Sequence, residues 1–489
     1  MTASEIDIIA KTVLIHLTKK TKKDFDEATE LLAKYIENAE HIYTIRNDKI
    51  SEVWIYIDGI YEPHGKTHVK EILRQILTDA YRNTIYNAVI VKIEADTFID
   101  QEVFFRDDTP YLLPVKNGLL ELKSQKLIPF DSKYKFFNKI NATYNPKAKC
   151  PAIIKFFESI LKDEDDITTM QEIYGFCLVR EYFLEKAIMF IGEGRNGKSK
   201  TVELLKRFLN ASNCANISLQ ALEKDNFAMA ELHNKMANLS ADISDEAIQH
   251  TGNFKSLTGR DLISASRKFL PRVNFVNYAK MIFCANQLPI THDESLAFFN
   301  RWVLIEFIYK FLSQKEHDTL TDEDVKRYKL EDPAIIEKII TEEEMSGLLN
   351  WALEGLSRLL RDKDFSLSST AKEIKNTWLR LSNSVRAFGE DCIIADVPSY
   401  IPKQVFKVVY LQYCQKKRLK PLTTKSIKYT LEILYGAYED RKYIGQERPY
   451  CWCGIKFKDS ARIDYDIDSI KIGEDTDENA DQPKKPKKT

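Results

Sequence analysis

The eight residues from Gly192 to Ser199 read Gly-Glu-Gly-Arg-Asn-Gly-Lys-Ser and fit the pattern G-x-x-x-x-G-K-[ST] in full. Glycines at these positions let successive backbone N–H groups converge on phosphate oxygens at the N-terminus of a helix. The pattern predicts that Lys198 bridges the β- and γ-phosphates of ATP and that the Ser199 hydroxyl coordinates Mg²⁺. The expected nucleotide-binding residues are Gly192, Gly194, Asn196, Gly197, Lys198 and Ser199.

A phosphate loop of this kind needs a carboxylate on a neighbouring strand to hold the metal ion. The run from Met236 to Asp242 predicts a strand that ends in such a carboxylate, with Asp245 and Glu246 just beyond it. An acidic cluster at a strand end can also be a solvated turn that caps the next helix. We expect Asp242 to be a metal ligand and catalytic, and which of the three carboxylates acts as the base stays open.

Two further polar residues follow apolar runs downstream of the acidic strand. Asn286 ends the run 280–285 and stands shortly before Pro289. It is either a turn former or a sensor of the γ-phosphate at the end of the neighbouring strand. Arg301 lies among aromatic residues, where a guanidinium either only covers apolar surface or acts as an arginine finger on the transferring phosphoryl group.

These side chains require a layer of strands and helices to position them. An apolar run at 187–191 precedes the loop, a helix is predicted over 198–209, and strands are predicted at 236–243 and 281–285. Such alternation indicates an α/β fold with a phosphate-loop core. The chain divides into a mainly helical N-terminal region with short strands at 1–150, the core at 151–320, a helical connector at 321–390, a compact domain at 391–465 and a disordered tail at 466–489.

Residues 263–275 predict a β-hairpin whose tip, near Lys268–Pro271, combines cations with one aromatic ring. Cations follow phosphates, and an aromatic ring can stack on a base without sequence preference. The alternative is an edge hairpin that is basic only to prevent aggregation. The candidate DNA contacts here are Arg267, Lys268 and Arg272.

The segment 401–459 holds 13 Lys and Arg against 5 Asp and Glu, although the whole chain has a net charge of only −1. Charge is therefore segregated, and the neutral total does not exclude nucleic-acid binding. Two helical runs followed by two β runs give the order of a winged helix. The candidate DNA contacts are Lys425 and Lys428 on the second helix and Arg441 and Lys442 on the wing, and a basic solvated face is the alternative.

Length and composition describe an ordinary soluble globular chain of 489 residues, of which 44% are hydrophobic. No apolar run is long enough to span a bilayer, so no membrane partner is expected. The closest cysteines, Cys451 and Cys453, lack the spacing of a zinc knuckle or a redox motif. We expect a cytoplasmic protein, with nuclear import through the terminal Lys-Lys-Pro-Lys-Lys as the less favoured alternative.

Taken in order, these motifs resemble those of superfamily 3 helicases, in the branch of phage and plasmid primase-helicases and the poxvirus NTPase-primase. The loop of that branch reads G-x-G-x-N-G-K-S, its next motif reads K-x-L-T-G-x-D before a basic stretch, and its sensor strand ends in N-x-L-P. The chain departs from the family at its arginine motif, where only the second arginine is present. The matching residues outside the loop are Lys255, Leu257, Thr258, Gly259, Asp261, Asn286, Leu288 and Pro289, and Arg301 keeps the second arginine.

The resemblance implies an AAA+-like, ring-forming ATPase, expected to be a hexamer, in which Arg301 reaches the γ-phosphate of the neighbouring subunit. It also implies that the basic hairpin lines a central channel and that the chain ends in a winged helix. The function expected is an ATP-dependent replicative helicase of a virus, phage or mobile element, acting on single-stranded and forked DNA. A replication initiator or loader with little unwinding activity is the alternative, and a phosphate-loop kinase fits the basic elements less well.

Members of this branch often carry a primase domain ahead of the helicase. Only about 45 residues precede the part of the chain that resembles the family, and Asp24-Phe25-Asp26 is the one D-x-D pair there. That pair falls in a Lys-rich amphipathic helix, which does not suit a catalytic site. We therefore expect no primase activity in this chain, and a separate primase or polymerase as a partner.

Overall fold

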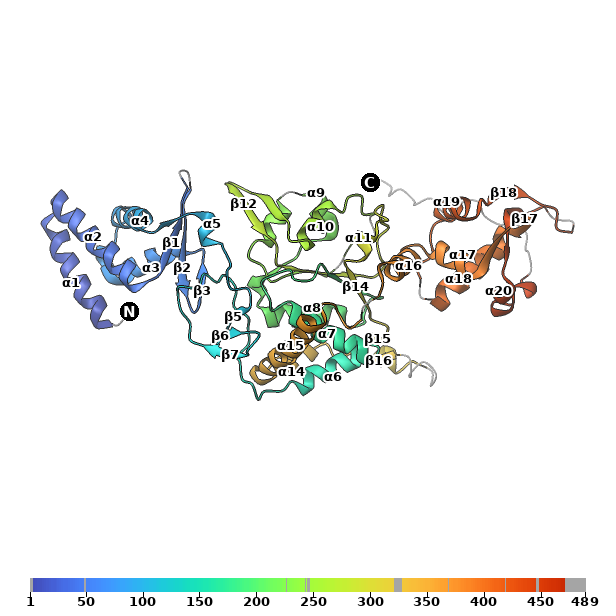
Figure 1. Cartoon of the computed structure of the whole chain (residues 1–489), viewed down its shortest axis with the longest axis horizontal. Helices are drawn as coiled ribbons and strands as arrows, with labels where there is room; N and C mark the ends of the chain where they lie inside the picture. Colours follow the sequence, from blue (N-terminus) through green and yellow to red (C-terminus); the bar gives the residue numbers. More distant parts are fainter. Residues whose placement is uncertain are drawn as a thin grey trace, which may run out of the picture. The chain divides into compact units, whose positions relative to one another are not determined.

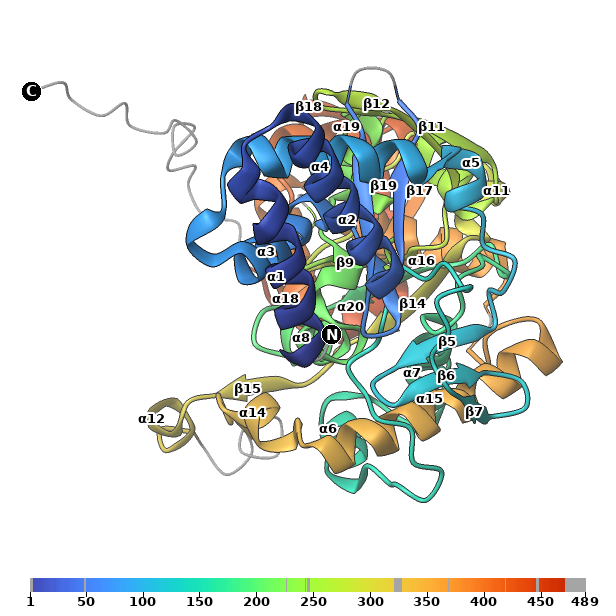
Figure 2. The same ribbon diagram turned by 90° about the vertical axis from the view of Figure 1, so that its left-hand side faces the viewer.

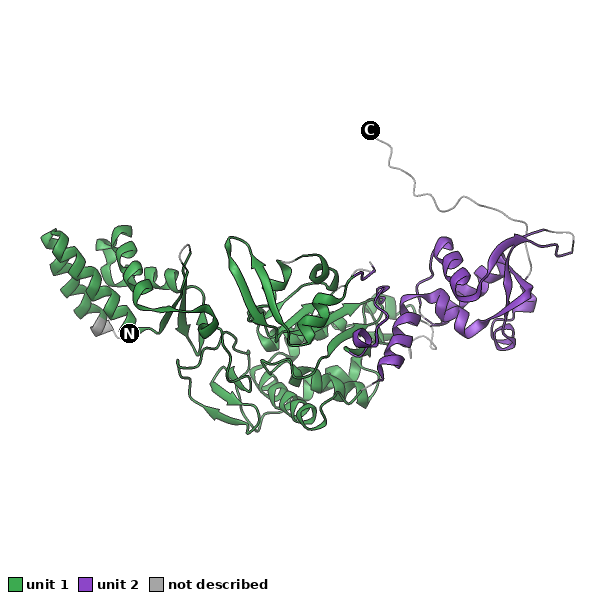
Figure 3. Ribbon diagram, turned by 45° about the horizontal axis from the view of Figure 1, so that its top comes forward, with its two compact units in different colours: residues 1–243, 250–286, 301–368 green, residues 244–249, 287–300, 369–489 purple. Residues whose placement is uncertain are grey.

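The computed structural model describes residues 3–47, 50–225, 227–241, 243, 247–320, 328–367, 369–417, 419–445 and 448–470. The chain forms two compact units, coloured separately in Figure 3. The first unit comprises residues 1–243, 250–286 and 301–368, and the second comprises 244–249, 287–300 and 369–489. Within the described ranges, no helix is both long and apolar enough to cross a membrane.

The first unit begins with two antiparallel helices, α1 (Ala3–Lys19) and α2 (Lys22–Ala39), which lie side by side in Figure 2. A four-stranded sheet of order β3-β2-β1-β4 follows, and α3 and α4 share its hydrophobic core with α2. The predicted hairpin around Asp58-Gly59 is present as β2 and β3. The bounds are β1 (Ile42–Ile45), β2 (Glu52–Ile57), β3 (Ile60–Glu62), α3 (Gly65–Leu77), η1 (Thr78–Ala80), α4 (Asn83–Asp96), β4 (Phe98–Ile99) and α5 (Gln101–Phe104).

A three-stranded antiparallel sheet, β5-β6-β7, comes next and includes the strand pair predicted from Asn117-Gly118. Two helices then lead into the core, and a long late helix packs on the second of them. Gly355 makes that packing close, because a Cβ there would lie 2.3 Å from the carbonyl oxygen of Gln171. The bounds are β5 (Leu112–Val115), β6 (Gly118–Glu121), β7 (Lys126–Ile128), α6 (Pro151–Ile160), α7 (Glu164–Phe176) and α15 (Glu342–Asp362).

The centre of the first unit is a five-stranded parallel sheet of order β14-β8-β13-β10-β9 (Figure 1). Strand β8 (Ala187–Ile191) is buried along its whole length, and α8 (Lys198–Leu209) follows it, both with the predicted bounds. Strands β9 and β14 were not predicted from the sequence. The strand predicted at 236–243 is present but spans only Ala237–Ser240. The remaining bounds are β9 (Cys214–Ala215), β10 (Ala237–Ser240), β13 (Lys280–Ala285) and β14 (Trp302–Glu306).

Short elements join these strands. Between β10 and β13 the chain forms the predicted hairpin of two antiparallel strands. After β14, two short parallel strands pair with each other. The bounds are η2 (Ala211–Asn213), α9 (Leu219–Lys224), η3 (Ala228–Leu232), α10 (Gly252–Thr258), β11 (Leu262–Arg267), β12 (Leu270–Val276), β15 (Lys310–Leu312), α12 (Gln314–His317), β16 (Tyr328–Leu330) and α14 (Ile335–Ile339).

The second unit has its own hydrophobic core around Phe388, Tyr410 and Trp452. The predicted order of two helices followed by two strands is confirmed, and a further strand before them completes the antiparallel sheet β17-β19-β18. Ile467 is buried in the same core, so ordered structure continues past residue 465. The bounds are α11 (Leu296–Phe299), α16 (Ala371–Ser382), α17 (Ser384–Cys392), β17 (Ile393–Pro402), α18 (Lys403–Lys417), α19 (Thr424–Tyr435), β18 (Tyr438–Arg441), β19 (Tyr450–Phe457), α20 (Asp459–Asp464) and η4 (Ile467–Ser469).

Candidate functional site

The glycine-rich loop leaves the carboxyl end of β8 and turns directly into α8. Three residues of this turn have a positive φ: Gly192 at 151°, Arg195 at 60° and Gly197 at 97°. Glycine tolerates such angles at little cost, whereas other residues rarely adopt them. Ile160 of α6 packs against the loop, because a Cβ on Gly197 would lie 2.8 Å from its Cγ2 atom. Packing against α6 therefore fixes the path of the loop from the end of β8 to the start of α8.

Lys198 is the first residue of α8, and its side chain folds back over the loop. Its Nζ atom donates to the carbonyl oxygen of Glu193 at 3.1 Å and to that of Gly192. It also donates to the side-chain oxygens of Asn286 at 3.2 Å and Asn196 at 3.3 Å. The structure therefore brings together three residues that the sequence singled out, and the amide of Asn286, directly after β13, meets the ammonium of Lys198.

Asn196 shapes the loop from inside. It is buried, its Nδ2 donates to the carbonyl oxygen of Phe307 at 3.2 Å, and its Oδ1 accepts from the backbone N–H of Lys198 at 3.4 Å. Phe307 directly follows β14, so this amide links the loop to the neighbouring strand. The sequence listed Asn196 among the nucleotide-binding residues, and its contacts in the structure are those of a residue that fixes the shape of the loop.

Arg195 ties the outside of the loop to a segment more than a hundred residues later. Its guanidinium contacts both carboxylate oxygens of Glu316, at 2.7 and 2.8 Å, and its carbonyl oxygen accepts from the N–H of Phe311 at 2.7 Å. The Ser313 hydroxyl and N–H, together with Arg195, lower the pKa of the Glu316 carboxyl to about 2. Sequence reasoning missed this pair, because no motif spacing relates residues so far apart.

The metal-binding part of the predicted site is covered only in part by the described residues. Ser199 is exposed on the first turn of α8, beside Lys198. Asp242, Asp245 and Glu246 lie outside the described residues, so their roles stay predictions. Strand β10 runs parallel to β13, and therefore its carboxyl end meets the same edge of the sheet as Asn286.

Arg301 lies at the opposite edge of the sheet. It precedes β14, and its carbonyl oxygen accepts from the N–H of Ala187 at the start of β8. Its Nε donates to the Thr258 hydroxyl at 3.0 Å and its Nη2 contacts Glu185 at 2.9 Å. At about 3.3 Å per residue, the five residues of β8 separate Arg301 from the loop by roughly 16 Å. The structure therefore does not bring Arg301 to the loop of its own chain.

The basic hairpin ends in a two-residue tip, Lys268 and Phe269. The Phe269 ring is 84% exposed, and the Lys268 ammonium lies 5.3 Å from its centroid. Arg272 is exposed on β12, where its Nε donates to the Ser266 hydroxyl at 3.3 Å. Arg267 differs from these residues, because it is bound to Glu52. The tip thus offers cations and a ring to solvent, and Arg267 does not.

The predicted basic residues of the second unit lie on α19, at the end of β18 and, for Lys442, directly after β18. Lys425 and Lys428 are exposed, and Lys428 contacts Glu439 at 3.1 Å. The Arg441 guanidinium lies 4.2 Å from the centroid of the Tyr450 ring. Lys442 contacts Asp440 at 2.9 Å. Two of these four cations already have a carboxylate partner, which lowers the free positive charge of this face.

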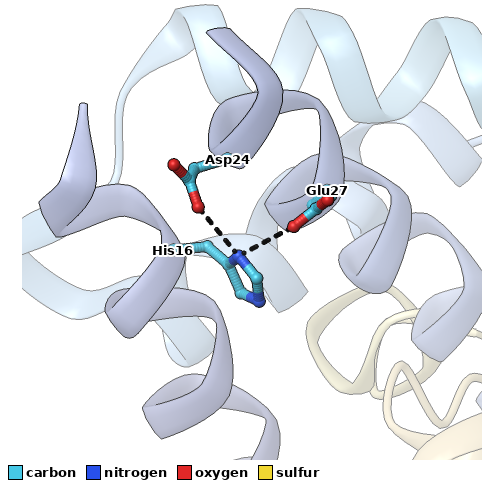
Figure 4. Close-up of side chains that lie close together, drawn as sticks. All are labelled: His16, Asp24 and Glu27. Carbon is cyan, nitrogen blue, oxygen red and sulfur yellow. Dashed lines mark ion pairs between the residues drawn. The ribbon is translucent and has the colours of Figure 1, made fainter. Parts of the chain in front are cut away.

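A separate cluster of possible metal ligands joins α1 to α2 (Figure 4). The Nδ1 atom of His16 lies 3.4 Å from Asp24 and 3.2 Å from Glu27. Lys19 contacts Asp24 at 3.2 Å, and Lys23 lies 3.8 Å from Glu27. Because each carboxylate already has a lysine beside it, we interpret the cluster as an ion-pair network that fastens the two helices.

Comparison with known proteins gives two partial family matches. Residues 19–162 match the family described as "D5 N terminal like", and residues 190–301 match a family of unknown function, DUF5906. The second match runs from the last residues of β8 to Arg301 and so contains the loop, the hairpin and Asn286. Neither match by itself spans half of the chain.

A curated relative is the "Putative helicase L207/L206" of Acanthamoeba polyphaga mimivirus, which is 24% identical over 288 residues. The match covers 51% of this chain but only 27% of that protein. Among solved structures, two of the NrS-1 C-terminal region in its apo state each show 14% identity and a TM-score of 0.44. Each of these alignments covers 86% of this chain and 98% of the solved chain.

Proposed function

We propose that this protein is an ATP-dependent DNA helicase that serves the replication of a virus, phage or mobile element. The observation that carries the proposal is the meeting of Lys198 and Asn286, 3.2 Å apart, at the carboxyl edge of a parallel sheet. A lysine at the start of the loop helix and an amide on the adjacent strand form the arrangement expected around a γ-phosphate. The similarity to a viral protein named as a helicase supports this reading.

The residues at the loop fit a nucleoside triphosphate with Mg²⁺. Among the described residues, no atom other than those of its two chain neighbours lies within 4 Å of a Cβ on Gly194, which leaves open space beside the loop. When a nucleotide binds, Lys198 would donate to phosphate oxygens in place of the loop carbonyl oxygens. Asn286 would stay beside Lys198. Ser199 and Asp242 would hold the metal ion, which supplies charge neutralisation when it is bound.

Arg301 fits this proposal only as a residue that acts on a neighbouring subunit. Its distance from its own loop and its place at the amino edge of β14 suit a ring in which each site is completed by the next chain. We propose a homo-oligomer, with a hexamer as the expected form. A separate primase or polymerase would act beside it.

The DNA contacts proposed are the hairpin tip and the second unit. Lys268, Phe269 and Arg272 combine cations with an exposed ring, which suits single-stranded DNA. From α17 to β19 the second unit has a helix, a strand, two helices and two strands in the order of a winged helix, and Lys425 and Lys428 lie on α19, the third helix of this run. We propose that this domain binds the duplex part of a fork.

The first experiment measures ATP hydrolysis with and without single-stranded DNA. Wild type is expected to hydrolyse ATP and to be stimulated by DNA, and Lys198→Ala is expected to lose at least about 100-fold of this rate. Lys206→Ala changes an exposed lysine on the same helix and serves as the matched control. Equal loss in both variants, or no loss in Lys198→Ala, contradicts the assignment of the loop.

The second experiment separates a helicase from an initiator or loader. A forked duplex with a labelled strand is incubated with ATP, and strand displacement is followed over time. Wild type is expected to displace the strand, and Lys268→Ala is expected to keep basal hydrolysis but to lose DNA stimulation. Hydrolysis with DNA stimulation but no displacement would favour the loader.

A further inference from the structure

All three nitrogen atoms of the Arg267 guanidinium, at the end of β11, have a partner inside the first unit. Its Nη2 and Nη1 atoms contact the two carboxylate oxygens of Glu52 at 2.9 and 3.2 Å, and its Nε donates to the carbonyl oxygen of Pro271 at 3.0 Å. The two charged side chains are only 16% and 19% exposed. A two-pronged arginine–carboxylate pair of this kind fixes direction as well as distance.

The second strand of the hairpin is held at a different point. The ring of His233 lies 4.7 Å from that of Phe105, just after α5, and 5.2 Å from that of Phe275 in β12. Burial, together with the nearby Arg267, lowers the pKa of His233 to about 4, so the imidazole is neutral and packs as an aromatic group. Each strand of the hairpin therefore has a contact with the rest of the first unit, through a different kind of interaction.

These contacts divide the basic residues of the hairpin into two groups. Lys268 and Arg272 are exposed, whereas the charge of Arg267 is already neutralised by Glu52. Glu52 and Pro271 use three of the five N–H donors of Arg267, and the Glu52 carboxylate balances the charge that would otherwise attract a phosphate. That Arg267 binds DNA therefore stays a prediction, and its contacts favour a role in holding the hairpin.

We propose that Glu52 is a positioning residue for nucleic-acid binding: by holding Arg267, it sets the direction in which the hairpin tip presents Lys268 and Phe269. The inference rests on the proposed function, because the tip is the DNA contact. Glu52 belongs to β2 of the N-terminal sheet. Through this ion pair, the N-terminal region therefore contributes to the response of ATP hydrolysis to DNA. Without the ion pair, the hairpin tip is no longer held in one orientation, and DNA binding stimulates ATP hydrolysis less.

The test compares the full-length variants Glu52→Ala, Arg267→Glu and the exchanged pair Glu52→Arg with Arg267→Glu. The measurements are basal ATP hydrolysis, its stimulation by saturating single-stranded DNA, and the DNA concentration that gives half-stimulation. Each single variant is expected to keep basal hydrolysis within twofold and to lose at least fivefold of the stimulation. The exchanged pair is expected to recover most of it, since it restores the ion pair with reversed charges. Glu71→Ala, an exposed glutamate of α3, is the matched control and is expected to behave as wild type.

The outcomes separate this proposal from the proposed function. If wild type is stimulated and Lys268→Ala is not, while Glu52→Ala behaves as wild type, the positioning role is wrong and the helicase assignment stands. If Arg267→Glu raises the DNA concentration for half-stimulation without changing the maximum, and the exchanged pair does not recover it, Arg267 is a direct phosphate contact and the proposal fails. A wild type without DNA stimulation overturns both ideas. A thermal melt of each variant identifies loss of folding, and in that case Glu52→Gln, which keeps size and hydrogen bonding, replaces Glu52→Ala.

Discussion

Two glycines of the loop, Gly192 and Gly194, fit the same motif but have different surroundings. A Cβ on Gly192 would lie 2.3 Å from Nδ2 of Asn196 and 2.5 Å from the carbonyl oxygen of Phe307, and its φ of 151° is rare for other residues. A Cβ on Gly194 would have no atom of the described residues within 4 Å apart from its two chain neighbours, and its φ is not positive. We therefore expect Gly192→Ala to damage the loop and Gly194→Ala to leave its shape unchanged.

The magnitude follows from the contacts that Gly192→Ala breaks. The backbone angle costs about 1–3 kcal/mol for a residue with a Cβ. Displacing Asn196 loses its hydrogen bonds to Phe307 and Lys198, at about 1 kcal/mol each. The total is about 3–5 kcal/mol. It appears as lost stability where the free loop keeps its shape, and as at least a roughly 100-fold loss of nucleotide affinity where the free loop relaxes and must regain this shape to bind. For Gly194→Ala we expect a change in stability within about 0.5 kcal/mol.

The assay is thermal unfolding of both variants, followed by titration with a fluorescent ATP analogue in the presence of Mg²⁺. Gly192→Ala is expected to melt several degrees below wild type, whereas Gly194→Ala melts within about 1 °C of it. Equal melting temperatures for the two variants, or a lower one for Gly194→Ala, would show that the contacts around Gly192 do not hold the loop. The predicted difference between the two glycines would then be wrong.

Three further predictions test other parts of the site. Glu316→Gln removes the charge that holds Arg195, and because the pair is half exposed we expect at most about a fivefold loss of nucleotide affinity in the same titration. Burial lowers the pKa of Lys280 from the usual 10.5 to about 7, so between those values the unfolded chain binds more protons than the folded one. The melting temperature of wild type should therefore rise with pH from 7 to 10 relative to that of Lys280→Met, and parallel curves would contradict the shift. Lys198→Ala and Arg301→Ala should each lack ATP hydrolysis, and an equal mixture of the two should recover about a quarter of the wild-type rate if each site takes one residue from each of two chains. No recovery after subunit exchange would argue against a shared site.

Local patterns predicted the elements around the loop well. The bounds of β8 and α8 are those expected from an apolar run, a glycine turn and a helical spacing of apolar residues. The hairpin at 262–276 also followed from its alternation and its turn. These features depend on residues close in sequence, so the sequence contains the information that determines them.

Features that depend on distant residues were missed. Strand β14 pairs with β8, which lies more than a hundred residues earlier, and of its residues only Trp302 belongs to the arginine motif that the sequence indicates. The partners of Arg195 and Arg267 are 121 and 215 residues away. Nothing in one sequence indicates that Glu52 rather than another glutamate meets Arg267, because a salt bridge places no constraint on spacing.

The direction of the parallel strands carries the strongest argument about assembly. Parallel strands place all their carboxyl ends at one edge, where Lys198 and Asn286 meet, and all their amino ends at the other, where Arg301 lies. No rotation of a side chain closes the roughly 16 Å between these edges, since an extended arginine reaches only about half as far. If Arg301 takes part in the chemistry, it therefore acts on another chain, and it must first leave Glu185, 2.9 Å away in its own chain.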